Sequence, residues 1–440
     1  MGTVQRAGVA QPAGAAGRPD WLACLQEMCE LLWPPPAVVR LGDSKPARAG
    51  LKGGPRRDET AAWLDRREFA LIAGIHQPPL LVPADRHAAA GALGHYCHPQ
   101  VRIKRLGVKA LCLGLRGGLG GVALRRRVLV SAPGGADTIE EYLTAVLSRD
   151  IQVSMYLGPA RANRKPVLQL LVGTGEPAGF AKIGVNPLTC SLVRAEHDSL
   201  VRLGRAGLRE ITIPKVLHYD TWRGLEVLVL SPLPAWQSPR PLPAPRLAAA
   251  MAELARVGGL TTEPLSHSRY LGQLRSRLAA ADPGAERAAL LHALDDLTAR
   301  AGGETLTFGS WHGDWSPWNM ASTGSGLLVW DWERFATGVP LGFDALHHWL
   351  QARVAGHHEP AAAARSCAER APRELAPFGI AARQAQLTAV LYLADLATRY
   401  LTDRQAQAGA RLGATETWLI PAIAGEVARL RGAPGGQAGL

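Results

Sequence analysis

Apolar and polar positions alternate in short blocks between residues 136 and 231. The sequence Thr138-Ile139-Glu140-Glu141 is a capping box, and it predicts a helix that ends near Ser148. The apolar runs that follow are short and typical of buried strands, apart from one segment with helical periodicity between Thr189 and Leu203. The expected strands are 152–157, 167–172, 179–185, 216–218 and 227–230.

The pattern changes after this block. Six prolines stand between Pro232 and Pro245, and because such a stretch cannot form a helix, it is predicted to connect two lobes. Beyond it, residues 246–300 and 340–431 are rich in Ala and Leu and are expected to be mostly helical. The chain is therefore predicted to be an α+β protein. Its parts are a β-rich lobe at 136–231, a connector at 232–245 and an α-rich lobe at 246–431.

The first 135 residues are organised differently. Apolar residues at helical spacing predict one short helix from Trp21 to Leu32, within a segment 1–60 that otherwise consists of a partly disordered tail and loops. Met1 to Pro19 has no apolar core and is expected to be a tail, not a signal peptide. Residues 61–135 are expected to form a small basic α/β region. Its predicted elements are strands at 79–83 and 128–130 and a helix at 101–115.

Positive charge is concentrated in this N-terminal part. The chain has a net charge of +12, and residues 1–134 hold 19 Lys and Arg against nine Asp and Glu. Few aromatic residues interleave with these charges, so a solvated basic face is favoured over a nucleic-acid site. No apolar run reaches the roughly 18 residues that a bilayer span needs. The six cysteines form no CxxC pair, which is typical of a reducing compartment, so we expect a cytoplasmic protein. Nothing in the sequence indicates its oligomeric state.

The strongest chemical signal is the segment from Trp311 to Asn319. It fits the spacing H-x-D-x-x-x-x-N, with His312, Asp314 and Asn319 at the fixed positions. Phosphoryl transfer needs a carboxylate that orients the attacking hydroxyl and accepts its proton, and oxygen ligands for a metal ion that neutralises the phosphates. An Asp and an Asn on one loop can supply both, and Ser316-Pro317 keeps that loop from forming a regular helix.

A second carboxylate follows on a predicted buried strand. The apolar run Leu327 to Trp330 ends in Asp331, twelve residues after Asn319. A carboxylate at the tip of such a strand suits a second ligand of the same metal ion, whereas an isolated Asp at a strand end is usually a turn residue. The two segments in this order predict a kinase-type active site with Asn319 and Asp331 as the metal ligands.

These segments resemble the aminoglycoside phosphotransferase and choline kinase superfamily, whose pattern is H-G-D-x-x-x-x-N followed by a hydrophobic strand that ends in Asp. Asp344 resembles the downstream structural Asp of that family. The resemblance covers roughly residues 150–400 and does not extend to residues 1–135. It implies a two-lobed protein-kinase-like fold, ATP or GTP with Mg²⁺, transfer of phosphate to the hydroxyl of a small molecule, and catalytic roles for Asp314 and His312.

The resemblance also implies a paired lysine and glutamate in the β-rich lobe. Lys182 lies in a short apolar strand, where a lysine is costly to bury without a partner. Glu196 lies on the apolar stripe of the helix 189–203, so the favoured interpretation is a Lys182–Glu196 pair that serves the nucleotide. The alternative is that Glu196 occupies a partly exposed edge of that helix.

The loop that should cover the phosphates, 157–166, departs from the family pattern because it has one glycine, Gly158, in place of three. Its backbone amides near Ala162 and Asn163 are expected to approach phosphate oxygens, together with Arg161 or Arg164. The alternative is an ordinary basic hairpin. Gly158 and Asn163 thus join Lys182 and Glu196 as predicted nucleotide-binding residues.

Other residues near the motifs are expected to have structural roles and no part in the chemistry. His347-His348 and His357-His358 are expected on helix surfaces, and the tryptophans around the motif are expected to pack the loop. Beyond residue 340 the chain has ten Arg against eight acidic residues, which favours a neutral or anionic acceptor over a polycation.

Two other functions stay open at this point. The glycine-poor loop would suit a catalytically weak pseudokinase or nucleotide-binding regulator, with residues 1–135 as an interaction module. The joint presence of Asp314, both metal ligands and the Lys182–Glu196 pair favours an active enzyme instead. A protein kinase is disfavoured because Asp331-Trp332-Glu333 replaces D-F-G and no A-P-E follows.

Overall fold

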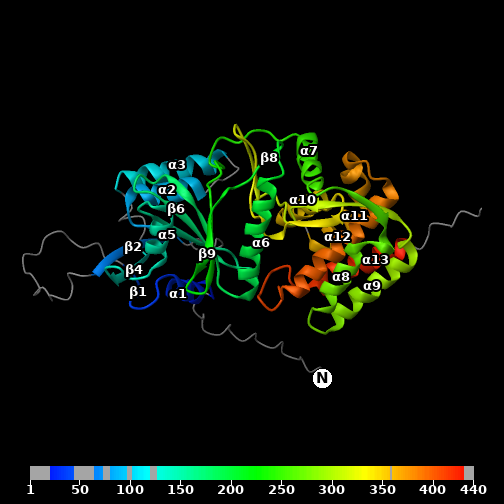
Figure 1. The fold of residues 1–440 in the computed structure, drawn as a ribbon, viewed down its shortest axis with the longest axis horizontal. Helices are drawn as coiled ribbons and strands as arrows, with labels where there is room; N and C mark the ends of the chain where they lie inside the picture. The colour runs from blue at the N-terminus through cyan, green and yellow to red at the C-terminus, as the bar shows by residue number, and fades with distance from the viewer. Residues whose placement is uncertain are drawn as a thin grey trace, which may run out of the picture.

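The computed structural model describes residues 20–43, 64–72, 80–96, 102–118, 126–356 and 359–430. A strand-rich part and a helix-rich part lie side by side, and helix α6 (Pro187–Gly204) stands between them (Figure 1). The expected α+β class with two lobes is confirmed. The predicted tail, Met1 to Pro19, and the pair His357-His358 lie outside the described residues.

One large sheet forms the strand-rich lobe, with nine strands in the order β1-β4-β2-β3-β5-β6-β7-β10-β9. Each strand pair in it is antiparallel. In chain order its strands are β1 (Val38–Asp43), β2 (Leu64–Ile72), β3 (Leu80–Pro83), β4 (Arg126–Pro133), β5 (Gln152–Leu157), β6 (Pro166–Leu171), β7 (Pro177–Gly184), β9 (Val216–Trp222) and β10 (Leu225–Leu230).

The sheet continues across the boundary that the sequence suggests near residue 135. β3 pairs with β5, which places Leu80 opposite Tyr156 and Leu81 opposite Met155. The Ser154 hydroxyl adds a hydrogen bond to the carbonyl of Leu81 at 2.9 Å. Residues before and after this boundary therefore share one sheet, while the division of the chain into separate units stays a prediction.

Helices cover both faces of this sheet, because successive side chains of a strand point to opposite faces. On one face, α1 (Asp20–Leu32) and α5 (Ile139–Leu147) pack on the central strands. On the other face, α2 (Arg86–Tyr96) and α3 (Arg102–Arg116) form a smaller core with β3, and α6 packs on β10. The strand-rich lobe thus presents α6 to the helix-rich lobe.

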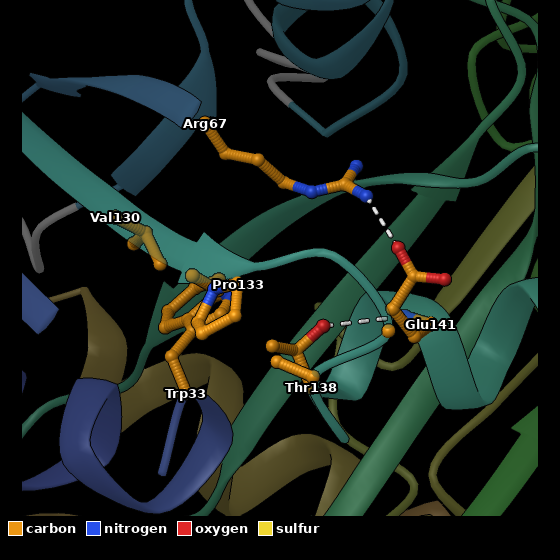
Figure 2. Close-up of a pocket in the computed structure, with 9 residues that line it drawn as sticks. Trp33, Arg67, Val130, Pro133, Thr138 and Glu141 are labelled. Carbon is orange, nitrogen blue, oxygen red and sulfur yellow. Dashed lines mark hydrogen bonds and ion pairs between the residues drawn. The ribbon is translucent and has the colours of Figure 1, made fainter. Parts of the chain in front are cut away.

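A small pocket marks the junction between the N-terminal strands and α5 (Figure 2). Thr138 accepts the backbone amide of Glu141 at 3.4 Å and so caps α5, as the capping box predicts. Arg67 of β2 donates to the Glu141 carboxylate at 2.9 Å, and the indole of Trp33 donates to Glu140 at 3.1 Å. These contacts join the N-terminal strands to the first helix of the segment that follows them.

The helix-rich lobe is built around α12 (Ala382–Thr402), whose side chains are buried along most of its length. Its mostly helical structure agrees with the composition of residues 246–300 and 340–431. The surrounding helices are α7 (Ala244–Ala255), α8 (Arg269–Ala279), α9 (Ala285–Ala301), α10 (Phe343–Ala355), α11 (Pro360–Leu375) and α13 (Leu419–Arg429).

Two three-stranded sheets carry the segments with the chemical motifs. One has the order β11-β12-β15 and the other β13-β14-β8. Their strands are β8 (Ile211–Thr212), β11 (Thr261–Pro264), β12 (Thr305–Trp311), β13 (Met320–Thr323), β14 (Gly326–Val329) and β15 (Ala336–Pro340). Between β10 and α7 the chain forms no helix, and its single bridge pairs Pro239 with Thr323 of β13. Among the described helices, none has the length and apolar character that crossing a membrane requires.

Candidate active site

The H-x-D-x-x-x-x-N segment forms the loop between β12 and β13. The loop starts from a buried strand end: Trp311, the last residue of β12, is 4 % exposed. Gly313 follows with a φ of +84°, and a Cβ on it would lie 2.1 Å from the carbonyl oxygen of Arg334. Glycine is therefore required at this turn, both for its φ and for the close approach of the backbone. The turn brings Asp314 within hydrogen-bonding distance of Asn319.

The Asp314 carboxylate accepts three side-chain hydrogen bonds. Oδ1 accepts from the Ser316 hydroxyl at 2.7 Å and from Nε2 of His347 at 2.8 Å, and Oδ2 accepts from the Asn319 amide at 3.0 Å. Burial opposes the charge of this carboxyl, yet the hydrogen bonds from His347 and Ser316 outweigh burial and hold the pKa of Asp314 well below its usual range. Asp314 is therefore ionised at neutral pH, and its oxygens are fixed in place.

His347 does not lie on a helix surface, so the sequence prediction for it is wrong. Its side chain is 2 % exposed, because α10 is packed between the Asp314 loop and α12. The Tyr392 hydroxyl lies 3.1 Å from Nδ1, and Nε2 faces Asp314. Burial lowers the pKa of His347 although Asp314 acts to raise it, so the ring is neutral and donates to Asp314 from Nε2.

His312 is fully buried and bonds to backbone atoms. Nδ1 accepts the amide of Asp314 at 3.1 Å, so Nε2 carries the proton and donates to the carbonyl of Trp330 at 3.0 Å. Burial lowers the pKa of His312 to about 4, and the ring is therefore neutral. This geometry ties the Asp314 loop to the residue before Asp331, while the catalytic role of His312 stays a prediction.

Asp344, near the start of α10, holds the same loop from the other side. Its carboxylate accepts the backbone amides of His312 at 2.8 Å and of Gly313 at 3.3 Å. Burial raises the pKa of Asp344 to about 7, against the effect of these two amides. The contacts agree with the structural role that the resemblance implies for this residue.

Asp331 lies two residues after the end of β14 and has a φ of +74°, a left-handed conformation that is uncommon outside glycine. The Lys182 ammonium donates to Asp331 Oδ1 at 2.6 Å and to both carboxylate oxygens of Glu196, each at 2.6 Å. The predicted Lys182–Glu196 contact is present, and Glu196 is 0 % exposed, which excludes the alternative of an exposed helix edge. Burial lowers the pKa of Lys182, but Asp331 and Glu196 outweigh burial and raise it above its usual range.

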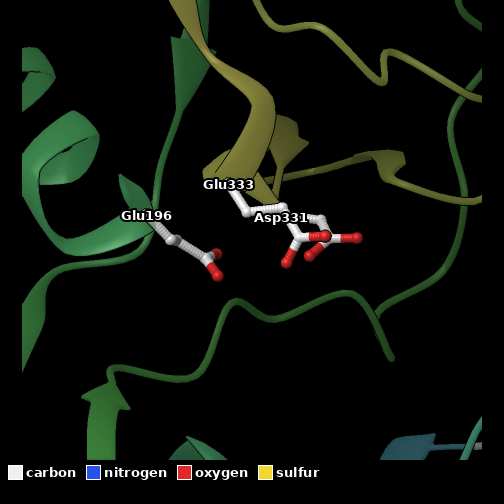
Figure 3. Close-up of side chains that lie close together, drawn as sticks. All are labelled: Glu196, Asp331 and Glu333. Atoms are coloured by element: carbon white, nitrogen blue, oxygen red, sulfur yellow. The ribbon is translucent and has the colours of Figure 1, made fainter. Parts of the chain in front are cut away.

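A third carboxylate joins this cluster, and the sequence analysis missed it. Glu333, on the short 3-10 helix η3 (Trp332–Arg334), lies close to Glu196 and Asp331, and carboxylate oxygens of all three lie within 4.8 Å of one another (Figure 3). Lys165 forms an ion pair with Glu333, and the amide of Asn163 approaches the same carboxylate at 3.4 Å. The spacing of Glu333 two residues after Asp331 is the signal that could have indicated it.

The loop 158–165 between β5 and β6 also contacts the helix-rich lobe through Gln405. The Gln405 side chain accepts the amide of Ala162 at 3.3 Å and lies 3.5 Å from Asn163 Oδ1. Gly158 has room for a side chain, since a Cβ there would meet its nearest atom at 3.9 Å. The loop is thus held in place by its polar residues, and the one glycine is not required by its surroundings.

Asn319 and Asp331 have the donor atoms that Mg²⁺ prefers. The Asn319 amide nitrogen faces Asp314, donating to its backbone carbonyl at 2.9 Å, which leaves the amide oxygen free to face a metal ion. The Asn319 carbonyl accepts the amide of Trp330 at 3.0 Å, so the chain segments that carry Asn319 and Asp331 are adjacent. A carboxylate and an amide oxygen are hard oxygen ligands, and these residues therefore fit the metal ion that the motif implies.

Most tryptophans around the motif pack the loop, as expected. Trp315 and Trp332 are 0 % exposed and belong to the core that joins α6 to β14, whereas Trp318 is 44 % exposed. The residues that sequence reasoning missed are the side chains that hold the predicted ones in place: Lys165, Ser316, Glu333, His347 and Gln405.

No family model and no curated protein matches the chain in sequence. Solved structures with a similar fold include a choline/ethanolamine kinase family protein from Mesorhizobium loti, with 15 % identity, a TM-score of 0.39, and coverage of 61 % of this chain and 85 % of that chain. A thermostable mutant of an aminoglycoside phosphotransferase in its apo form has 13 % identity, a TM-score of 0.45, and coverage of 67 % and 100 %. A spectinomycin phosphotransferase in complex with ADP and spectinomycin has 10 % identity, a TM-score of 0.39, and coverage of 67 % and 97 %. The chain resembles these small-molecule kinases in structure alone.

Proposed function

We propose that this protein is a small-molecule kinase that transfers the terminal phosphate of ATP or GTP to a hydroxyl group. The observation that carries the proposal is the Asp314 carboxylate, ionised and held by three donors, on a loop that is hydrogen bonded to the segment leading into Asp331. An acceptor-orienting carboxylate and a lysine–carboxylate cluster at one place are the parts that phosphoryl transfer needs.

In this proposal Asp314 accepts a hydrogen bond from the acceptor hydroxyl and takes its proton as the bond to phosphorus forms. The low pKa of Asp314 makes it a weak base, which suits a loose transition state in which the proton moves late. Ser316 and His347 keep the carboxylate oriented, and His312 keeps the loop in register with Asp331.

Lys182 is proposed to bind the phosphate chain of the nucleotide, with Glu196 holding its ammonium in place. Asn319 and Asp331 are the residues proposed to hold Mg²⁺, which would neutralise the phosphate oxygens and orient them for transfer. Gly158 and Asn163 stay proposed contacts of the loop 157–166 with the nucleotide.

A neutral or anionic acceptor is supported by the charges beside the Asp314 loop. Arg399 donates to the carbonyl of Gly313 at 2.7 Å, and its guanidinium carbon lies 5.1 Å from the ring centroid of Trp311. Arg334 is also adjacent, and its ion pair with Asp403 balances the charges of both residues, so Asp403 adds no net negative charge there. The positive charge of Arg399 beside the Asp314 loop disfavours a polycationic acceptor at this place.

The test is a screen for release of nucleoside diphosphate from ATP and from GTP against amino alcohols, sugars and antibiotics. The parent should release diphosphate with at least one acceptor far faster than with water, and the Asp314→Asn protein should not. Tight nucleotide binding without turnover on any acceptor would favour a nucleotide-binding regulator instead. Robust turnover of kanamycin-like compounds would contradict the proposed acceptor class.

A further inference from the structure

Lys165 is a second buried lysine beside the proposed phosphate site. It ends the loop 158–165, immediately before β6, and its side chain is 7 % exposed. The ammonium does not point to solvent, as most lysines in loops do, but pairs with Glu333. Burying a lysine is costly unless its charge is paired, and Glu333 supplies that pairing here.

The cluster around Lys165 holds more acidic side chains than basic ones, so it is more than a single lysine–carboxylate pair. Three carboxylates, Glu196, Asp331 and Glu333, converge on one place, and two lysines, Lys182 and Lys165, face them. Lys182 already contacts both Glu196 and Asp331. Among the described residues of this cluster, Lys182 therefore donates to two carboxylates, whereas Lys165 donates to one, that of Glu333.

The loop holds Lys165 in this position through neighbouring residues. Asn163, two residues earlier, approaches Glu333 at 3.4 Å, and the amide of Ala162 donates to Gln405 at 3.3 Å. A loop with three glycines offers backbone amides to phosphate oxygens, whereas this loop has one glycine that its surroundings do not require. A pre-positioned ammonium could do the same task with a side chain.

We propose that Lys165 is a phosphate-binding residue, and that Glu333 is the counter-ion that Lys165 exchanges for the phosphates of the nucleotide. This inference rests on the proposed kinase function. Without nucleotide, Glu333 stabilises the buried ammonium. When the triphosphate binds, its oxygens replace Glu333 at Lys165, so that two lysines, Lys182 and Lys165, contact the phosphate chain.

The exchange has two consequences of opposite sign. Lys165→Met removes a phosphate contact, so the affinity for the triphosphate should fall by at least about tenfold. Glu333→Gln removes the group that competes with phosphate for Lys165, so the affinity measured without metal should rise several-fold. A lysine that only stabilised the fold would give neither the increase nor any dependence on phosphate.

The experiment is isothermal titration of the full chain with ATP, GTP, ADP and adenosine, in EDTA and in Mg²⁺. Lys165→Met should weaken binding of the triphosphate and diphosphate and leave adenosine unchanged, and Lys165→Arg should restore most of the loss. Lys109→Met, which removes an exposed lysine of α3, is the matched control and should bind as the parent does.

A further variant separates binding from folding. Lys165→Met alone leaves Glu333 buried without its cation, so the double variant Lys165→Met/Glu333→Gln removes both charges and should keep the parental thermal midpoint. It should bind the triphosphate at least about tenfold more weakly than Glu333→Gln alone. Equal binding by these two proteins would overturn the inference.

The outcomes also separate this inference from the function on which it rests. If the parent bound no nucleotide, both would fail. If the parent bound and turned over nucleotide while Lys165→Met bound it equally well, only the role of Lys165 would be overturned. Equal weakening of adenosine and triphosphate would show that Lys165 acts on the fold of the loop, and would also overturn it.

Discussion

The segment 312–333 and the loop 157–166 meet at Glu333, yet only the first follows the sequence pattern expected of it. In the first, every predicted side chain has its partner: Asp314 is held by donors, and Asp331 contacts Lys182. In the second, the expected glycines are missing, and polar side chains fix the loop instead. Side chains that do chemistry need a fixed spacing, whereas contacts to phosphate can be made by backbone or by side chain.

The difference extends to the way each segment is anchored. The Asp314 loop is tied to its own lobe by buried groups, including Asp344 and His347. The loop 157–166 belongs to the strand-rich lobe but is held by Glu333 and Gln405 of the other lobe. Its position therefore depends on how the two lobes sit together.

The largest effect is expected at Asp331, which contacts Lys182 and lies two residues before Glu333, where the two segments meet. Asp331→Ala should reduce turnover below detection and make nucleotide binding insensitive to Mg²⁺, because it removes the proposed carboxylate ligand of the metal. Nucleotide titrations with and without Mg²⁺ measure this, and the thermal midpoint controls for folding. If Mg²⁺ still tightened nucleotide binding as in the parent, Asp331 would not be a ligand.

Asp314→Asn should lower kcat by ~10²–10⁴-fold, the usual cost of losing a general base. It keeps the shape of the side chain and removes the charge that orients the acceptor hydroxyl. Nucleotide affinity should barely change, because the proposed metal ligands are intact, so the loss should appear in kcat and not in the KM for nucleotide. Steady-state turnover and nucleotide binding are measured on one preparation. Near-parental turnover, or lost binding in a folded protein, would remove Asp314 from this role.

The Lys182–Glu196 pair tests whether the proposed nucleotide site acts as a unit. Changing either residue to Ala should raise the KM for nucleotide by ~10²-fold, because it leaves a buried charge without its partner. The double change should cost little more than one single change. The measurement is a double-mutant cycle on the KM for nucleotide, and fully additive losses would show that the two side chains do not act together.

The smallest effect concerns His347, which the sequence analysis assigned to a helix surface. His347→Phe removes one of the three donors to Asp314 and should lower kcat by about tenfold. Because a donor to the ionised form depresses a pKa, its removal raises the pKa of Asp314, and the acidic limb of the kcat–pH profile should move to higher pH. An unchanged acidic limb would show that this hydrogen bond does not set the pKa of Asp314, and an unchanged kcat would show that it has no effect on catalysis.

The sequence was informative where a pattern is local. Strands β5 to β7 and helix α6 could be predicted because periodicity acts within one element. The Lys182–Glu196 contact could be predicted because a buried lysine needs a carboxylate partner. The pairing of β3 with β5 and the burial of His347 could not, because both depend on residues far away in the chain. Lys165 was passed over for the neighbouring arginines, since only the fold brings it to Glu333.

The pairing of β3 with β5 has a practical consequence for anyone who isolates the kinase-like part of this chain. A fragment that begins after residue 135 would lose β3, together with the hydrogen bond from Ser154 to Leu81. β5 would then become the outer strand of the remaining sheet, and its row of unpaired amides and carbonyls would be open to another chain. Such a fragment should be poorly soluble and prone to associate edge to edge, whereas the intact chain keeps this strand in the interior of its sheet.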